Sequence, residues 1–388
     1  SWGRLSFDPH RALRLSDPTS AALAIQEATR GLPYGMGRSY GDVCLNPQGY
    51  LWKTSGLDRM IGFDEREGVL TLEAGVLLRD VQQHFVPRGW MLPVTPGTQM
   101  VTVGGAIAND VHGKNHHCRG CFGHHIVRLR LARTTGEILE CGPDYNPEWF
   151  RATVGGLGMT GLILDATIRL MQVPGPMLWV ETLPQGNLDE FFRISSESEK
   201  DFEYTVSWID CLSGSPGRGI FLRANHTADI PKNVRLKASR RLPFTPPVSL
   251  VNPWTLKPFN FAYDRLNRLK KGFRLQHYAS FLYPLDNLLE WNRMYGPRGF
   301  YQYQCVVPFE GGKEAIEAIL KAIAKAKMGS FLAVLKTFGH RHSLGTLSFP
   351  MPGITLALDF PNQGAKSETL FQCLDAILLE VGGRIYPA

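Results

Sequence analysis

Two long glycine-rich loops constrain the fold of this chain more than any other feature of its sequence. The first reads Tyr-Gly-Met-Gly-Arg-Ser-Tyr-Gly-Asp at residues 34–42, and the second reads Pro-Gly-Thr-Gln-Met-Val-Thr-Val-Gly-Gly-Ala-Ile-Ala-Asn-Asp-Val-His-Gly-Lys at residues 96–114. Glycine lets backbone N–H groups come close to an anion, and Ser39, Thr98 and Thr102 add hydroxyl donors. Ordinary turn glycines are the alternative for either loop alone, but two such loops together favour a diphosphate cradle.

A third glycine segment matches the dinucleotide-binding fingerprint but has the wrong context. Gly-Leu-Gly-Met-Thr-Gly at residues 156–161 fits G-x-G-x-x-G letter for letter. The fingerprint must follow a strand and open a helix, whereas this segment follows a predicted helix at residues 147–152 and leads into a predicted strand at residues 162–170. We therefore reject a Rossmann fold and interpret the segment as a tight turn, whose following strand lies along the cofactor near Ile163.

The first half of the chain mixes helix and strand signals. Residues 69–74 have the pattern of a strand, and residues 77–85 have that of an amphipathic helix. Pro-Gly-Pro at residues 174–176 interrupts the chain, and the composition changes beyond it. Because 388 residues exceed what one core usually supports, we expect one domain at residues 1–174 and another at 175–382.

The second half ends in a regular succession of elements. Its periodicities predict strand, helix, strand, strand and helix at residues 300–307, 314–327, 330–338, 353–360 and 367–381. This order favours an antiparallel sheet with helices on one face, which leaves the other face free to cover a ligand. The predicted fold class is therefore α+β.

Cysteine count and hydropathy exclude two classes of protein. Seven cysteines spread along the chain do not form a disulfide framework. No apolar run reaches the roughly 18 residues of a membrane-spanning helix, and the first residues lack a signal-peptide pattern. We expect a cytoplasmic protein or one bound peripherally to a membrane, and a location at the periplasmic face of that membrane is an alternative.

The two glycine loops resemble the FAD-binding signature of the vanillyl-alcohol-oxidase superfamily, whose flavin domain is a two-subdomain, PCMH-type domain. Further motifs resemble the decaprenylphosphoryl-β-D-ribose 2′-oxidase family. They are His-Gly-Lys-Asn-His-His (112–117), Thr-Val-Gly-Gly-x-Gly-x-Thr-Gly (153–161), Glu-Trp-Asn-Arg-x-Tyr-Gly-Pro (290–297), Gln-Tyr-Gln (302–304), Leu-Ser-Phe-Pro-x-Pro-Gly (347–353) and Gly-Gly-Arg-Ile-Tyr (382–386). The resemblance spans nearly the whole chain and is looser at residues 177–275.

The resemblance implies which residues contact FAD. Matched by motif, they are Gly37, Arg38, Ser39, Tyr40, Gly41, Gly97, Thr102, Val103, Gly104, Gly105, Asn109, Asp110, Val111, His112, Ile163 and Tyr386. Tyr386 implies that residues of about 383–388 complete the flavin domain, and family members continue with a Lys three positions after this Tyr. Many superfamily members tether FAD covalently to a His in the first loop. Arg38 stands at that position here, which implies non-covalent FAD.

The resemblance also implies an activity. The family oxidises the ribose 2′-hydroxyl of a polyprenyl-phosphate sugar to a ketone, and a separate short-chain reductase returns it inverted to give arabinose. For this chain it therefore implies FAD-dependent oxidation at C2′ of a polyprenylphosphoryl ribose, with such a reductase as partner. A soluble sugar, aldonolactone or alditol oxidase of the same superfamily is the alternative.

Candidates for the chemistry come from both halves of the chain. Oxidation of an alcohol by a flavin requires a base or polar network that takes the hydroxyl proton. Six side chains are candidates: His112 and Lys114 after the second loop, and Gln302, Gln304, Lys336 and Asp359 on predicted strands. Period-two alternation would let the strand residues line the flavin, with Lys336 and Asp359 able to pair. A structural ion pair, glutamines on a solvated face and a structural His112 are the alternatives, and we assign no single base.

Two segments raise the question of other functions. Cys118 and Cys121 have C-x2-C spacing with His on both sides, but no second such pair follows, and we predict no metal site. Residues 232–274 carry eleven Lys or Arg and one acid, interleaved with Trp, Phe and Leu. This pattern favours a peripheral contact with an anionic membrane. A solvated loop is the alternative, and we predict no nucleic-acid binding because no such motif is present.

One position departs from the family. Mycobacterial members carry a cysteine two residues before the aspartate matched by Asp359, and nitroaromatic inhibitors activated by the reduced flavin trap it covalently. Ala357 stands there in this chain. The nearest thiols in the sequence are Cys305, predicted on the strand face opposite Gln304, and Cys373, predicted within a helix. The resemblance therefore implies that such inhibitors form no covalent adduct here.

Overall fold

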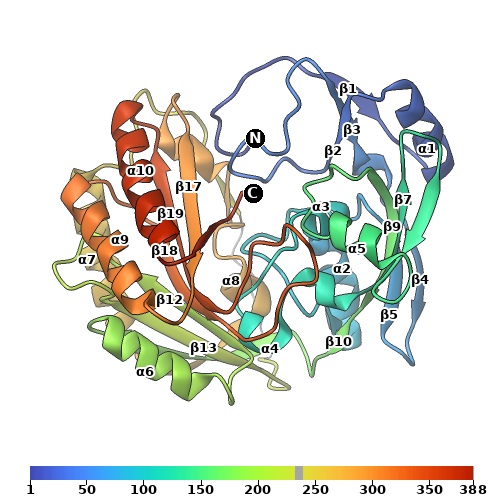
Figure 1. The fold of residues 1–388 in the computed structure, drawn as a ribbon. Coiled ribbons are helices and arrows are strands. Elements are labelled where there is room, and N and C mark those ends of the chain that lie inside the picture. The colour runs from blue at the N-terminus through green and yellow to red at the C-terminus, as the bar shows by residue number, and fades with distance from the viewer. Residues whose placement is uncertain (232–238, 388) are drawn as a thin grey trace.

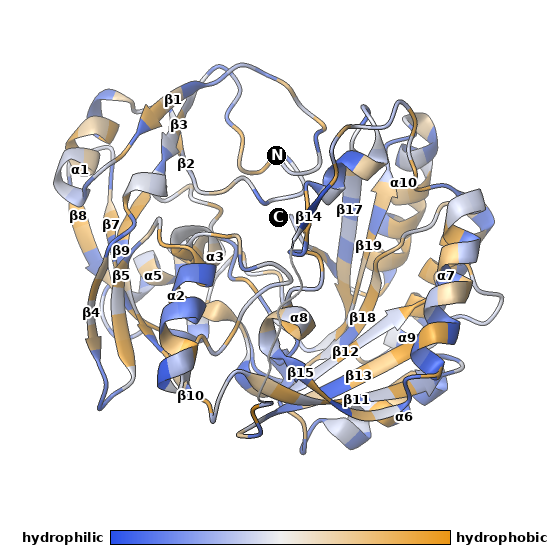
Figure 2. Ribbon diagram, turned by 180° about the vertical axis from the view of Figure 1, so that it is seen from behind, coloured by the Kyte–Doolittle hydropathy of each residue, from blue (hydrophilic) through white to orange (hydrophobic). Residues whose placement is uncertain are grey.

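Two large antiparallel sheets lie side by side in the computed structural model, which describes residues 1–231 and 239–387 (Figure 1). The two ends of the chain lie close together between them. Helices cover the outer face of the larger sheet, whereas several helices of the smaller sheet lie on its side facing the larger one (Figure 1), and hydrophobic residues recur along the strands of both sheets (Figure 2). The mixture of helices with antiparallel sheets confirms the predicted α+β class.

The five-stranded sheet is formed by the first half of the chain. Its strands, in spatial order, are β4 (Met60–Asp64), β5 (Val69–Glu73), β9 (Leu162–Arg169), β7 (Ile126–Ala132) and β8 (Ile138–Cys141). The predicted strands at 69–74 and 162–170 are thus confirmed, each ending one residue earlier. A parallel three-stranded sheet, β1-β3-β2 (Arg11–Arg14, Tyr50–Lys53, Gly31–Tyr34), and the pair β10-β6 (Met171–Gln172, Trp90–Met91) complete the strands of this half.

Helices pack the core of this half against β5 and β9. They are α1 (Pro18–Glu27), α2 (Leu78–Phe85), α3 (Val103–Ala108) and α5 (Pro147–Thr153). The short α4 (His116–Arg119) instead lies against the second half of the chain, where the His116 and Phe338 ring centroids are 4.3 Å apart. Helix α2 buries Leu78, Val81 and Phe85 on one side, which confirms the amphipathic helix that the sequence predicted. The segment at 156–161 is a turn, as predicted, and it bends sharply because Leu157 and Gly158 have positive φ angles of 55° and 78°.

The eight-stranded sheet is formed by residues beyond the Pro-Gly-Pro segment. Its strands, in spatial order, are β15 (Gly272–His277), β11 (Met177–Gln185), β13 (Gly219–Thr227), β12 (Tyr204–Ile209), β18 (Ala333–Phe338), β19 (Gly353–Pro361), β17 (Phe300–Val307) and β20 (Arg384–Ile385). Helices α6 (Leu188–Ser198), α9 (Gly312–Ala326) and α10 (Ala365–Glu380) supply the apolar core on one face. Helices α7 (Pro253–Arg268) and α8 (Tyr278–Leu282) and the short parallel pair β14-β16 (Arg240–Arg241, Leu288–Leu289) complete the elements.

The predicted succession of five elements is confirmed, with one strand shorter than expected. Residues 330–332 do not join β18, because the Ser330 hydroxyl forms local hydrogen bonds with the backbone N–H and C=O of Leu332. The same hydroxyl accepts the backbone N–H of Asp359, which ties this turn to β19. Whether residues 174–176 separate two domains stays a prediction.

Strand register places the candidate residues of the second half on one face. Gln304 pairs with Ala357 across β17 and β19, Ala357 pairs with Val334 on β18, and Val334 pairs with Trp208 on β12. Directly paired residues point to the same side of a sheet. The alternate residues, such as Cys305 and Leu335, are buried against the helices on the other face. No helix among the described residues is both long and apolar enough to span a membrane.

Candidate active site

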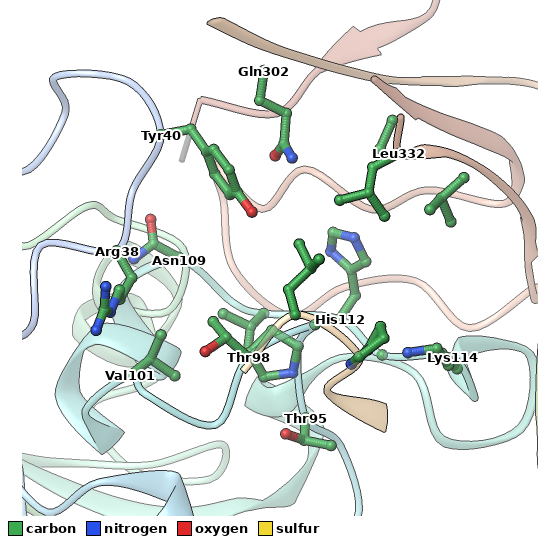
Figure 3. Close-up of a pocket in the computed structure, with 18 of the residues that line it drawn as sticks. Arg38, Tyr40, Thr95, Thr98, Val101, Asn109, His112, Lys114, Gln302 and Leu332 are labelled. Atoms are coloured by element: carbon green, nitrogen blue, oxygen red, sulfur yellow. The ribbon is translucent and has the colours of Figure 1, made fainter. Parts of the chain in front are cut away.

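A large cavity lies between the glycine loops and the free face of the eight-stranded sheet. Its volume is about 1320 Å³, above the roughly 300–1,000 Å³ of ordinary ligand pockets. Figure 3 shows Gln302 and Leu332 on one side of the cavity and Thr95 and Thr98 on the other. The cavity therefore has room for a dinucleotide-sized cofactor together with a substrate.

The first glycine loop offers unpaired backbone donors to this cavity. Within the described residues, no backbone N–H at positions 36–42 donates a hydrogen bond. Two glycines are required for the path of this loop, because a side chain at either would clash with its neighbours. A Cβ on Gly35 would meet Thr102 Oγ1 at 2.4 Å, and one on Gly37, whose φ is +58°, would meet the Tyr34 hydroxyl at 2.1 Å. Arg38 stacks on Trp2 at 4.0 Å, and its buried Nε has no partner among the described groups. These donors suit an anionic ligand such as a diphosphate.

The second loop contributes differently from what its sequence indicates. Thr102 caps α3 by accepting the N–H of Gly105, while Val103 and Gly104 donate to the carbonyls of Val76 and Ala74. The first N–H groups of α3 are thus paired within the protein and are not free for a phosphate. Two buried polar side-chain atoms of the second loop have no partner among the described residues, Oδ1 of Asn109 and Nδ1 of His112.

His112 lies at the centre of the site with Gln304. The amide nitrogen of Gln304 is 2.8 Å from Nε2 of His112, and the rings of Phe338 and Tyr386 stand 4.9 and 5.3 Å from the imidazole. Burial, and then the charge of Lys336, hold the pKa of His112 well below its usual value. His112 is therefore neutral at pH 7, and its buried Nδ1 has no partner within the described residues.

Two lysines face the same cavity without a carboxylate partner. Lys336 donates to the carbonyl of Gly113 at 3.3 Å, and Lys114 donates to the carbonyl of Leu282 at 2.7 Å. Neither forms an ion pair with any residue that the structure describes. Desolvation lowers the pKa of Lys336 to about 8, and desolvation together with Lys336 lowers that of Lys114 to about 7. An anion bound nearby would favour the charged form of both.

Asp359 does not pair with Lys336, which corrects the pairing considered from the sequence. Lys336 lies opposite Thr355 on β19, four residues from Asp359, and that separation is about 13 Å along a strand. Asp359 instead accepts a hydrogen bond of 3.0 Å from the Gln302 amide. Burial raises the pKa of its carboxyl to about 7. The two glutamines thus each hold one titratable group, His112 or Asp359.

Most of the residues that the sequence proposed line this cavity. They are Gly37, Arg38, Ser39, Tyr40, Gly97, Thr102, Gly104, Gly105, Asn109, Val111, His112, Lys114, Ile163, Gln302, Gln304, Lys336, Asp359 and Tyr386. Gly41, Val103 and Asp110 do not. The Val103 side chain is in the core, and Asp110 accepts the Gly123 N–H and the Ser348 hydroxyl at 2.8 and 2.6 Å. Gly41 lies beside the Pro387 carbonyl. Their contact with FAD stays a prediction, and for Gly41 it would be made through the backbone N–H, which is unpaired within the described residues.

Sequence reasoning missed the apolar part of the cavity. Val206, Trp208 and Leu222 line it from β12 and β13, and Phe259 and Tyr263 line it from α7. Their segment lacked clear motifs, although Val206 and Trp208 already stand two residues apart in the sequence, the spacing of one strand face. Part of the basic segment 232–274, at residues 232–238, lies outside the described residues.

The described residues hold no cluster of three or more His, Cys, Asp or Glu side chains arranged to bind a metal. The seven cysteines are all free thiols. Cys121 is buried and lies 3.3 Å from the Ser343 hydroxyl, and His124 Nε2 lies 2.9 Å from the carbonyl of His342. These side chains thus link the segment after the second loop to residues 342–343.

Comparison with known proteins agrees with this geometry. An FAD binding domain family matches residues 19–142. The chain is 36% identical over 407 residues to decaprenylphosphoryl-β-D-ribose oxidase of Mycolicibacterium smegmatis, covering 100% of this chain and 87% of that protein. It is 29% identical to an uncharacterized protein in the mprA 5′ region of Streptomyces coelicolor (80% and 88% covered), and 30% identical to bovine (Bos taurus) L-gulonolactone oxidase (48% and 42% covered).

The residues of the cavity fit FAD. The unpaired N–H groups at 36–42 and the unpaired Arg38 Nε are available to a diphosphate, and residues 36–42 lie within the matched FAD binding domain. The partnerless Nδ1 of His112 and Oδ1 of Asn109 are polar atoms that a bound ring system with donors and acceptors would satisfy.

Proposed function

Because the chain belongs to the decaprenylphosphoryl-β-D-ribose oxidase family, we propose that it oxidises C2′ of a polyprenylphosphoryl ribose to a ketone, with FAD held non-covalently. Membership makes the chain an FAD-dependent oxidoreductase that acts on CH–OH groups. Our proposal adds three points to this general activity: the substrate, the carbon that is oxidised and the non-covalent binding of the flavin.

The observation that carries the substrate assignment is the pair of lysines without carboxylate partners. Lys114 and Lys336 line one cavity with His112 and Gln304, so cationic groups stand beside groups that form hydrogen bonds. A half-buried ammonium group is costly unless an anion accompanies it. A sugar phosphate supplies that anion together with the hydroxyls, whereas a free sugar or lactone does not.

The chain's own residues would orient the sugar and receive its proton. FAD, when bound, supplies the acceptor for the hydride that leaves the alcohol carbon. Gln302 and Gln304 stand two residues apart on one strand face, which separates them by about 7 Å. Their partners Asp359 and His112 are therefore spaced to contact the two ends of a pentose. Asp359 is the better proton acceptor, because its pKa of about 7 matches neutral pH while that of His112 is depressed. His112 would then orient the hydroxyl.

The proposed activity is tested by anaerobic mixing. We expect a polyprenylphosphoryl ribose to bleach the flavin within the mixing experiment, and free ribose, aldonolactones and alditols to leave it yellow. The product should weigh two hydrogens less than the substrate and should not be converted to arabinose until a short-chain reductase is added. Bleaching by the lactones or alditols alone would instead establish the alternative, a soluble sugar oxidase.

Non-covalent FAD gives a second prediction. Arg38 stands at the position of the tethering His, and a guanidinium that stays protonated is no nucleophile. Precipitation with acid should therefore release all of the yellow colour into the supernatant. Flavin that remained on the washed pellet would contradict non-covalent binding.

A peripheral membrane contact gives a third prediction. On α7, Trp254 and Phe261 are 89% and 66% exposed, and their spacing of seven residues puts them on one helix face. Lys257 and Arg265 lie on the same helix. An exposed aromatic face beside cations suits an anionic membrane.

We expect the double variant Trp254→Ser, Phe261→Ser to lose at least half of the binding to anionic liposomes while it keeps its FAD. Leu379→Ser is the matched control, because Leu379 is 81% exposed on α10, on the other side of the eight-stranded sheet. Equal liposome binding by the double variant and the control would remove α7 from the proposed contact.

A further inference from the structure

The cavity extends well beyond the flavin loops, along the face of the eight-stranded sheet. Its lining continues from Gln304 on β17 through Ala357 and Val334 to Trp208 on β12, and all four belong to one row of paired residues. Leu222 on the next strand, β13, also lines it. Four strand spacings separate β17 from β13, roughly 19 Å. This is longer than a sugar and its phosphate.

The far part of the cavity is an apolar lobe between the sheet and α7. Val206, Leu222, Leu332 and Val334 line it from the strands and the turn before β18. From α7, Tyr263 stands 4.5 Å from Trp208 and Phe259 stands 4.6 Å from Phe331, measured between ring centroids. The indole N–H of Trp208 donates to the Phe331 carbonyl, so it needs no hydrogen-bond acceptor from a ligand. The lobe therefore has apolar walls and suits an apolar chain.

The chemistry of the lining changes in a fixed order along the sheet. The His112–Gln304 pair stands at β17, the ammonium group of Lys336 stands on β18, and the apolar side chains Val206 and Leu222 follow on β12 and β13. A lipid-linked sugar has the same order of groups: hydroxyls, then phosphate, then hydrocarbon. At its far end the cavity reaches Lys270, an exposed cation of the kind that faces anionic lipid headgroups, and Arg274, whose guanidinium donates to the hydroxyl of buried Thr182 at 3.0 Å.

From this order we propose that the lobe under α7 binds the first isoprene units of the substrate's polyprenyl chain. The inference rests on the proposed function, since it takes the lipid-linked sugar phosphate as the ligand. It adds where the lipid leaves the site: across β18, β12 and β13, beneath Phe259 and Tyr263. Helix α7 then has two roles, with an inner face on the lipid chain and an outer face on the membrane.

Binding of isoprenyl monophosphates tests this directly, without turnover. Dimethylallyl, geranyl and farnesyl phosphate are titrated into the FAD-loaded protein by calorimetry. We expect the affinity to rise at least about tenfold from the shortest to the longest chain, because each buried methylene adds to binding. Leu222→Glu puts a charge into the lobe and should abolish the rise, and Tyr263→Ala should reduce it at least about threefold.

Leu379→Glu, on exposed surface of α10, is the matched control and should keep the full rise with chain length. If Leu222→Glu fails to retain FAD, Tyr263→Ala decides, since Tyr263 is only partly buried. Affinity independent of chain length in the wild type, or a rise that persists in both variants, would overturn the lobe as the lipid site. The proposed oxidation is tested independently of the lipid site. If the isoprenyl phosphates bind as expected but a polyprenylphosphoryl ribose does not reduce the flavin, the proposed function is rejected and the lipid site is retained.

Discussion

We expect Lys336→Met to lower the turnover of a polyprenylphosphoryl ribose by about 100-fold while the purified protein keeps its flavin. Loss of one preorganised charge contact in an enclosed site typically costs a factor of about 10² to 10³. Lys336 lines the cavity from β18 and is not part of the loop that carries the unpaired N–H groups at 36–42, so FAD content should change little. Stopped-flow flavin reduction and the absorbance ratio of flavin to protein measure the two quantities.

The pH profile separates a role in substrate binding from a structural one. The pKa of Lys336 is about 8, so its charge is present below pH 8 and is lost as the pH rises through that value. In the wild type, kcat/KM should fall above pH 8, and the Met variant should lack this step. Lys336→Gln is the control, because its amide can still donate to the Gly113 carbonyl. Full activity of Lys336→Gln would show that Lys336 only positions the segment that carries His112.

We expect a nitroaromatic inhibitor turned over by the wild-type enzyme to leave no stable adduct, and the Ala357→Cys variant to gain one per chain. Ala357 lines the cavity on β19 and pairs with Gln304, so a thiol there would face the ligand. Cys305 is one residue further along β17, fully buried on the helix side of the sheet, which confirms the opposite face predicted for it. Intact-protein mass spectrometry after turnover distinguishes the two chains.

Cys373 provides the internal control in that experiment. It is exposed on α10, on the outer side of the sheet, and should stay unmodified because an inhibitor activated inside the cavity does not reach it. Cys44 also lines the cavity, but burial raises the pKa of its thiol, so it too should stay unmodified. An adduct on Cys305 would mean that the sheet opens during turnover or that the inhibitor reacts without activation in the cavity, whereas an adduct on Cys44 would show that this thiol reacts with the activated inhibitor despite its partial burial. No adduct on Ala357→Cys would show that residue 357 does not face the reactive part of the inhibitor.

Local patterns predicted the elements of the second half because strand and helix periods depend on neighbouring residues alone. The alternation at 300–307 and 353–360 placed Gln302, Gln304 and Asp359 on one face, and the structure has them there. The boundary in this half that missed by most, at Ser330, depends on hydrogen bonds of a single hydroxyl, one of which reaches Asp359. Such a contact is invisible to a pattern of hydrophobic residues.

The sequence by itself therefore determined the α+β class, the order of the elements at residues 300–381 and the strand face on which Gln302, Gln304, Lys336 and Asp359 stand. The tertiary structure decided which candidates meet: His112 with Gln304, and Gln302 with Asp359, while Lys336 stands apart from Asp359. It also paired the first N–H groups of α3 within the protein and placed α7 over the sheet. These outcomes depend on the register between strands and on packing between distant segments, and the spacing of hydrophobic residues within one segment determines neither of them.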